Sequence, residues 1–222
     1  MSSPLTFKLL KQARERMELL KPINIILGSQ SPRRRELMAG LDIPFTCVTI
    51  DAEESYPADL KAGDIPMYIS RAKARAYAGE LKENDLLITS DTIVWLNGEM
   101  LGKPQDEADA KLMLSRLSGQ THEVYTAVCF TWLDTTLNHA TQPYTTLHHS
   151  FVDCTKVTFK TLSEEEIDYY VSKYRPLDKA GAYGVQEWIG YMGVTKMEGS
   201  YFNVMGFPIS RVYATLRELS VL

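Results

Sequence analysis

Short apolar runs alternate with amphipathic stretches in the first half of the chain, and long apolar runs separated by turns follow in the second half. This pattern predicts strands at 23–28 and 86–88, and helices at about 32–40 and 65–82. The other predicted elements are a strand at 45–50, a hairpin over 93–101, long strands at about 123–133 and 144–160, and helices at 106–118, 163–173 and 208–219. Because helices alternate with strands early and hairpin strands come later, the chain is predicted to form a mixed α/β sheet.

The composition is that of a globular protein with a sizeable core. The chain has 222 residues, of which 45% are hydrophobic and 23% charged, enough for one large domain or two closely joined lobes. The net charge of −4 draws it neither to nucleic acid nor to an anionic membrane, so neither is a predicted partner. No apolar run reaches 18 residues, and basic residues interrupt the N-terminus, so neither a membrane helix nor a secretory signal is predicted.

The three cysteines, Cys47, Cys129 and Cys154, are far apart in sequence and odd in number. We expect them to be reduced, buried residues of a cytoplasmic protein, not members of a disulfide or a zinc site. Residues 1–21 are predicted to be an extension ahead of the first strand, either a docking helix or a partly ordered segment.

Three consecutive arginines occupy the first turn of the first predicted helix. The strand at 23–28 leads into a turn containing Ser29, after which Ser31 can cap the helix and Pro32 fits its first position. Arginines at 33–35 then lie where the helix dipole disfavours cations and where unpaired amide hydrogens favour an anion. The segment therefore predicts a phosphate cradle; the alternative is a solvated basic turn.

Several other residues are candidates for chemistry at the same site. Asp91 is predicted just past the carboxyl end of a buried strand, where open α/β sheets bind ligands and a carboxylate can hold a divalent cation or accept a proton. Lys103, in a Gly-Lys-Pro turn, and Lys73, on an Ala-rich helix, could contact phosphate, and Glu54 could contact a metal. The alternatives are an Asx-turn for Asp91, solvent-facing lysines and a solvated acidic loop.

A loop of small residues at 178–186 surrounds one aromatic side chain. Tyr183 could stack on a base, and Gln186 offers a donor and an acceptor to a base edge. The alternative is that this loop only separates two lobes of the fold.

The order of these motifs resembles that of the Maf family of nucleoside triphosphate pyrophosphatases, over about residues 23–219. The matching motifs are Ser-Pro-Arg-Arg at 31–34, Asp-Thr at 91–92, Gly-Lys-Pro at 102–104, Leu-Ser-Gly at 117–119, Asp-Lys-Ala-Gly-Ala-Tyr-Gly-Val-Gln at 178–186, and Gly-Ser-Tyr-Phe-Asn-Val at 199–204. The resemblance implies a single domain over 22–222, with an inosine triphosphate pyrophosphatase-like fold of two lobes around a central cleft. It also implies hydrolysis of a nucleoside triphosphate to a monophosphate and pyrophosphate with a divalent metal, Mg²⁺ or Mn²⁺.

The same resemblance implies that Asp91 is the catalytic residue and that Glu54 and Asp91 are the residues at the metal. The implied substrate-binding residues are Arg33, Arg34, Lys73, Lys103, Thr92, Gln186, Ser29 and Ser31. The version of the 178–186 loop found here is similar to that of the branch acting on dTTP and UTP, with Arg33, Thr92 and Gln186 as specificity positions. The sequence departs from the family at 187–189, where Glu-Trp-Ile replaces a glycine-rich stretch.

Several alternatives stay open at this point. Asp91 could act mainly as a base or mainly as a metal ligand. The base acted on could be another or a modified one, the protein could be a non-hydrolysing nucleotide-binding regulator of cell division, or it could be an unrelated phosphate-binding module. The sequence also leaves open the oligomeric state, a homodimer included.

Overall fold

The computed structural model describes residues 23–134, 145–219 and 221–222, so the predicted extension at 1–21 lies outside the described residues. Strands of the described part are β1 (Asn24–Gly28), β2 (Thr46–Val48), β3 (Asp85–Leu96), β4 (Glu99–Leu101), β5 (Thr121–Asp134), β6 (Thr145–Phe159) and β7 (Val194–Glu198). Its helices are α2 (Pro32–Ala39), α3 (Asp64–Tyr77), α4 (Glu107–Leu117), α5 (Glu164–Tyr174), α6 (Trp188–Gly193), α7 (Tyr201–Val204) and α8 (Ile209–Glu218), with 3₁₀ turns η1 (Ala78–Glu80) and η2 (Ala180–Ala182).

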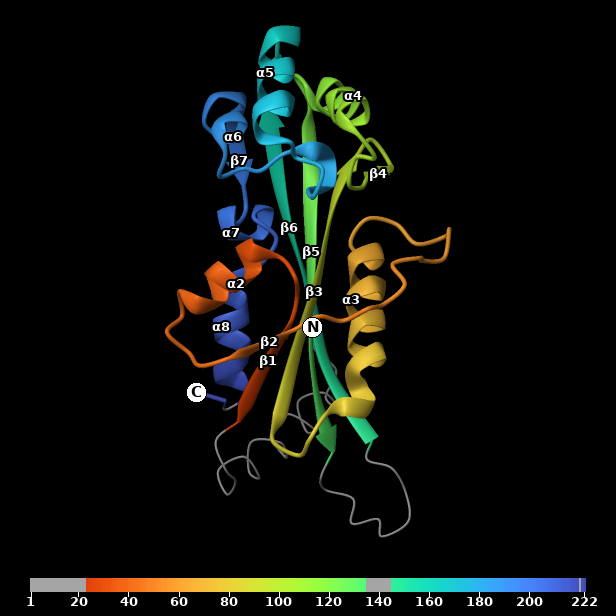
Figure 1. Ribbon diagram of the computed structural model, residues 1–222, viewed down its shortest axis with the longest axis vertical. Coiled ribbons are helices and arrows are strands. Elements are labelled where there is room, and N and C mark those ends of the chain that lie inside the picture. Colours follow the sequence, from red (N-terminus) through yellow and green to blue (C-terminus); the bar gives the residue numbers. More distant parts are fainter. Residues whose placement is uncertain (1–22, 135–144, 220) are drawn as a thin grey trace.

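Seven strands in the described residues form one mixed sheet, which confirms the predicted fold class. Their order is β2-β1-β3-β5-β6-β7, and β4 pairs with β3 outside this path. β1 runs parallel to β2 and to β3, whereas the other pairs are antiparallel. The long strands β3, β5 and β6 extend through most of the height of the molecule (Figure 1).

Helices cover the sheet differently at its two ends. In one lobe, α3 packs on one face and α2 and α8 pack on the other, as Figure 1 shows. This arrangement follows from the alternation along β3: Leu86 and Ile88 belong to the core under α2 and α8, and Leu87 to the core under α3. In the other lobe α4, α5 and α6 pack on the continuation of β3, β5 and β6.

Local sequence signals account for the element ends. Asn97 and Gly98 have φ values of 50° and 89°, as a two-residue hairpin turn requires, and they join β3 to β4 as predicted. Asp106 accepts the amide hydrogen of Asp109 at the start of α4. Ser163 begins α5 with the predicted capping box.

The prediction that Asp91 follows the end of a strand is wrong. β3 continues through Asp91, which is opposite Ala127 of β5, so Asp91 is not an Asx-turn residue either. What ends here is the neighbouring strand: Gly28, the last residue of β1, pairs with Thr89. Because β1 and β3 are parallel, the turn after Gly28 leaves the sheet beside Asp91, which opens a gap at this point.

The three cysteines are free, as predicted, but only Cys129 is buried; the prediction that all three are buried is wrong. Cys47 is exposed on β2, an edge strand. Cys154 is on the face of β6 opposite to the buried residues Thr155 and Val157, and solvent reaches that face. No helix among the described residues has the length and hydropathy needed to cross a membrane.

Candidate active site

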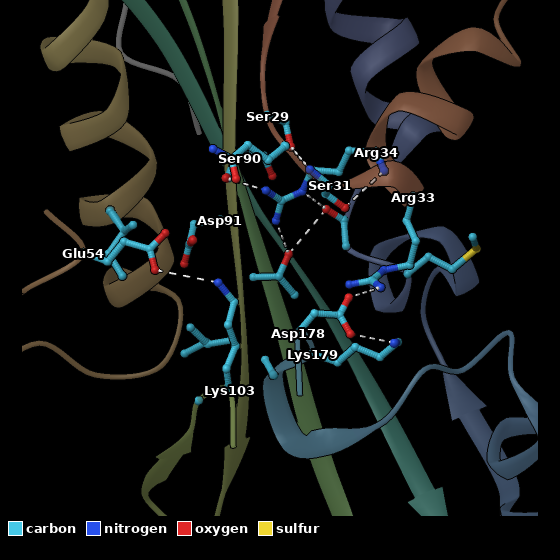
Figure 2. A pocket seen from close by; sticks show the side chains of 18 of the residues that line it. Ser29, Ser31, Arg33, Arg34, Glu54, Ser90, Asp91, Lys103, Asp178 and Lys179 are labelled. Atoms are coloured by element: carbon cyan, nitrogen blue, oxygen red, sulfur yellow. Dashed lines mark hydrogen bonds and ion pairs between the residues drawn. The ribbon is translucent and has the colours of Figure 1, made fainter. Parts of the chain in front are cut away.

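A cavity of about 680 Å³ opens where β1 ends and the two lobes meet. Residues from several separate segments line it, and Figure 2 shows Glu54, Asp91 and Lys103 on one side with Arg33 and Asp178 on the other. Every site residue expected from the sequence lines this cavity: Ser29, Ser31, Arg33, Arg34, Glu54, Lys73, Asp91, Thr92, Lys103 and Gln186. The structure therefore brings together residues that are more than 150 positions apart in sequence.

A lysine ammonium shared by two carboxylates lies on the Asp91 side of this cavity. Lys73 Nζ is 2.8 Å from Asp91 Oδ1 and 2.8 Å from Glu54 Oε1. The Lys73 and Asp91 side chains are each only 13% exposed, so the alternative of a solvent-facing Lys73 is wrong. α3 holds Lys73 in place because Thr89 of β3 donates a hydrogen bond of 2.7 Å to the Ser70 carbonyl of this helix.

The pKa values of the two carboxylates are shifted in opposite directions from their ordinary values. Burial raises the pKa of Asp91, and the charges of Lys73 and Arg34 offset this only in part. Burial also favours the neutral form of Glu54, but there the contacts with Lys73 and Lys103 outweigh it and the pKa is lowered. A carboxylate with a raised pKa binds a proton more readily, as a general base must.

Glu54 belongs to a loop that packs onto the sheet through apolar side chains. Tyr56 and Leu60 of this loop contact a buried cluster at the N-terminal end of α3. The Tyr56 hydroxyl is 3.6 Å from Met100 Sδ. Lys103, just after β4, places its Nζ 4.0 Å from Glu54 Oε2 and is 61% exposed. An ammonium in this position is free to move toward an anion that enters the cavity.

The turn after β1 has the geometry of an anion site. Ser31 caps α2 by accepting the Arg34 amide hydrogen at 3.4 Å, and its own amide hydrogen is donated to Ser29 Oγ at 3.1 Å. Arg35 donates from Nε and Nη2 to the Ser29 carbonyl, at 3.2 and 3.1 Å. Both serine hydroxyls accept in these contacts and keep their own hydrogens for a ligand.

The Arg34 side chain, predicted to bind phosphate, also makes three hydrogen bonds to the protein itself. Its Nε donates to the Gly206 carbonyl at 2.8 Å, Nη1 to the Ser90 carbonyl at 2.8 Å and Nη2 to Thr92 Oγ1 at 3.0 Å. Burial lowers its pKa, and the charge of Asp91 opposes this effect. Three of the five guanidinium hydrogens are thus engaged, which leaves two for a substrate.

Arg33 points to the opposite side of the cavity, where it begins a series of ion pairs with charged residues that were not predicted as site residues. Its Nη1 is 3.0 Å from Asp178 Oδ2, and Asp178 Oδ1 is 2.8 Å from Lys179 Nζ. Lys179 also pairs with Glu187 at 3.1 Å, and its side chain is only 9% exposed. The signal available in the sequence was the Asp-Lys pair directly before the Ala-Gly-Ala stretch.

The 178–186 loop lines one side of the cavity and contributes Gln186 to it. The amide oxygen of Gln186 is buried and has no hydrogen-bond partner among the described residues. Tyr183 lines the cavity, but it is almost fully buried and its hydroxyl is 2.7 Å from Nε2 of the buried His122. Burial lowers the pKa of His122 to about 4, so this imidazole is neutral near pH 7.

The donor set fits a hard divalent cation only in part. Glu54 and Asp91 already share one cationic group, the Lys73 ammonium, so their oxygens can reach a common ion. Within the described ranges no cluster of three or more His, Cys, Asp or Glu side chains has the geometry to hold a metal. Mg²⁺ is commonly held by one or two carboxylates, substrate phosphates and water, so the site fits a cation that arrives with a phosphorylated ligand.

Comparison with known proteins decides the family. The family model described as Maf-like protein matches residues 24–219. The chain belongs to the Maf family. Among curated relatives, a dTTP/UTP pyrophosphatase of Phocaeicola vulgatus is 50% identical over 204 residues, 91% of this Maf-family chain and 100% of the relative. A dTTP/UTP pyrophosphatase of Bacteroides thetaiotaomicron is 51% identical over 201 residues, 90% of this chain and 98% of the relative. Among solved structures, a HAM1 protein of Coxiella burnetii aligns with a TM-score of 0.42 at 16% identity, over 88% of this chain and 99% of that one.

Proposed function

We propose that the protein hydrolyses dTTP and UTP to the nucleoside monophosphate and pyrophosphate. The observation that carries the proposal is the placement of Asp91, a buried carboxylate with a raised pKa, in a cavity lined by cations from α2, α3 and the turn after β4. The substrate named for the Phocaeicola vulgatus and Bacteroides thetaiotaomicron relatives agrees with this chemistry.

Charge complementarity explains why a triphosphate fits. A nucleoside triphosphate carries up to about four negative charges, and positive groups fixed in advance stabilise charge that develops during phosphoryl transfer. Lys73, Lys103 and Arg33 surround the space in front of Asp91, and the Ser29–Ser31 turn adds hydroxyl and amide donors. Arg34 holds this turn against β3 and offers its two remaining hydrogens to the same anion.

The reaction assigned to Asp91 is proton removal from the attacking water. The water oxygen forms a bond to the α-phosphorus while the bond from this phosphorus to the bridging oxygen breaks, and pyrophosphate leaves. The water proton passes to the carboxylate of Asp91. The raised pKa of Asp91 suits this role, because a carboxylate at its ordinary pKa would be a weaker base.

Glu54 and Asp91 are the residues that would hold Mg²⁺ or Mn²⁺. When bound, such an ion neutralises charge on the phosphate oxygens. The Lys73 ammonium pairs with the same two carboxylates.

Gln186 is proposed to read the base. Uracil and thymine carry a hydrogen on N3, and the buried amide oxygen of Gln186 is an acceptor without a donor among the described residues. Cytosine has no hydrogen on N3, and leaving a buried acceptor unpaired disfavours the wrong substrate. Arg33 and Thr92 are the other proposed specificity positions, and both line the cavity.

The test is pyrophosphate release from dTTP, UTP, CTP and 7-methyl-GTP, each with Mg²⁺ and with Mn²⁺. We expect the largest kcat/KM with dTTP and UTP and no turnover when the divalent ion is chelated. Tight binding of a nucleotide without any product would replace the proposal by the regulator alternative. If a sugar phosphate competed as well as a triphosphate, the site would be a general phosphate-binding module.

A further inference from the structure

The turn that presents Gln186 is held from behind by two polar side chains. The Gly184 amide donates to the Tyr170 hydroxyl at 3.0 Å, and this hydroxyl donates to the carboxylate of Glu187. The Glu187 amide in turn donates to the Gly184 carbonyl at 3.0 Å. These three hydrogen bonds form a closed ring under residues 184–187, and Tyr170, on α5, is fully buried.

The Glu187 carboxylate fits this place closely. Its side chain is 19% exposed, and its carboxyl carbon is 2.7 Å from the position that a Cβ on Gly184 would take. A side chain at 184 would therefore displace the carboxylate.

The ring is connected to the phosphate side of the cavity. Glu187 pairs with Lys179, Lys179 with Asp178, and Asp178 with Arg33. The chain of ion pairs thus runs from Glu187, the residue before α6, to Arg33 of α2, and Arg33, Asp178 and Lys179 line the cavity.

Tyr170 and Glu187 do not line the cavity in the described part of the chain, whereas Gly184 and Gln186 do. An amide side chain can discriminate between bases only if its main chain stays in place, because Gln has several rotatable bonds and loses selectivity when it can follow either base. The ring supplies this restraint without contacting the nucleotide.

We propose that Tyr170 and Glu187 are positioning residues for base selection, which fix the Gly184–Glu187 turn so that Gln186 meets the pyrimidine ring in one orientation. This inference rests on the proposed function, since it concerns the substrate choice of the same site. It assigns no step of bond cleavage to either residue.

The experiment compares the variants Y170F and E187Q with the wild-type protein. Y170F removes the hydroxyl from the ring, while E187Q keeps an acceptor for Tyr170 but removes the charge facing Lys179. The matched controls are Y169F, the neighbouring residue of α5 whose exposed hydroxyl contacts Lys173, and E198Q, an exposed carboxylate of β7. Three quantities are measured for each: kcat/KM for UTP and for CTP, the inhibition constant of inorganic tripolyphosphate against UTP, and the thermal midpoint.

We expect the ratio of kcat/KM for UTP over CTP to fall about tenfold in Y170F, the effect of about one lost hydrogen bond, and by less in E187Q. The tripolyphosphate constant, which reports on the cations alone, should change less than about twofold in Y170F, because this variant keeps every ion pair. The controls should match the wild type in every measurement.

Two results would overturn the inference. One is an unchanged UTP-to-CTP ratio in both folded variants. The other is a parallel loss for UTP, CTP and tripolyphosphate, which would mean that the ring only supports the fold. Failure of the proposed function looks different, because the wild-type protein itself would then release no pyrophosphate from UTP. If Y170F does not fold, the UTP-to-CTP ratio of E187Q decides.

Discussion

The replacement of Asp91 by Asn separates the chemical role of this carboxylate from its structural role. The variant D91N keeps the size of the side chain and an acceptor for Lys73, whose Nζ is 2.8 Å from Asp91 Oδ1. It removes the group that is proposed to take the proton from water. General base catalysis contributes about 10²- to 10⁴-fold, so kcat should fall by this factor, equivalent to about 3–5 kcal/mol in the barrier.

The same replacement should not destabilise the protein near neutral pH. Because burial raises the pKa of Asp91 above its ordinary value of 3.8, the folded state binds this proton more tightly than the unfolded state. The wild-type protein therefore loses stability as the pH rises from 3.8 to the raised pKa, by about 1.4 kcal/mol for each pH unit between these two values. D91N has no such proton, so its stability relative to the wild type should increase over this interval and stay constant above it.

The assay combines pyrophosphate release from UTP with urea unfolding between pH 4 and pH 8. The control is D168N, on α5, where Asp168 is 61% exposed and pairs with Lys111 at the surface. We expect this control to keep full activity and to change the free energy of unfolding by less than about 0.5 kcal/mol. Turnover of D91N within a few-fold of the wild type would refute the role of Asp91. A D91N variant that is less stable at pH 8, with a difference that shrinks on acidification, would show that the ion pair with Lys73 outweighs burial.

Four further predictions concern the other residues of the cavity. K73M removes a charge that lowers the pKa of Asp91, so the acid limb of kcat/KM against pH, measured with UTP, should move to higher pH, and an unmoved limb would contradict this coupling. R34K loses guanidinium contacts to two carbonyls and Thr92, and should lower the free energy of urea unfolding by about 2–3 kcal/mol; an unchanged midpoint would contradict the bracing role. K103M, at an exposed position, should change the unfolding free energy by less than about 0.5 kcal/mol but reduce kcat/KM at least about tenfold in the pyrophosphate assay. Q186A should reduce kcat/KM for UTP about tenfold and that for CTP much less, and an equal loss for both would exclude base reading by this side chain.

Much of the secondary structure could be predicted because its signals are local. Asn-Gly specifies the hairpin after β3, since both residues tolerate positive φ, and a Ser with Glu three positions later specifies the start of α5. The end of β3 could not be predicted in this way. Thr-Ser-Asp-Thr suggests a turn by composition, but pairing with β5 carries the strand through Asp91. Tertiary pairing overrides local propensity there.

The electrostatic connections of the site were also beyond the sequence. Asp178, Lys179 and Glu187 are ordinary charged residues in sequence, and only the fold reveals the chain of ion pairs that joins them to Arg33. The burial of the cysteines was misjudged for a related reason. Whether a strand residue faces solvent depends on what covers its face of the sheet, which its own neighbours in sequence do not specify.

Local signals in the chain were enough to specify the fold class and most of the helices and strands before residue 188, because hydrophobic periodicity, caps and turn residues act between neighbours in sequence. The elements α6, β7 and α7 were not predicted. How the ionisable groups interact was settled only by folding. The fold placed Lys73 between two carboxylates and bound Arg34 to the carbonyl of Gly206, 172 positions away. Distances between such groups depend on strand register and helix packing, and burial then sets the pKa of Asp91, so the chemistry of the site exists only once the chain is folded.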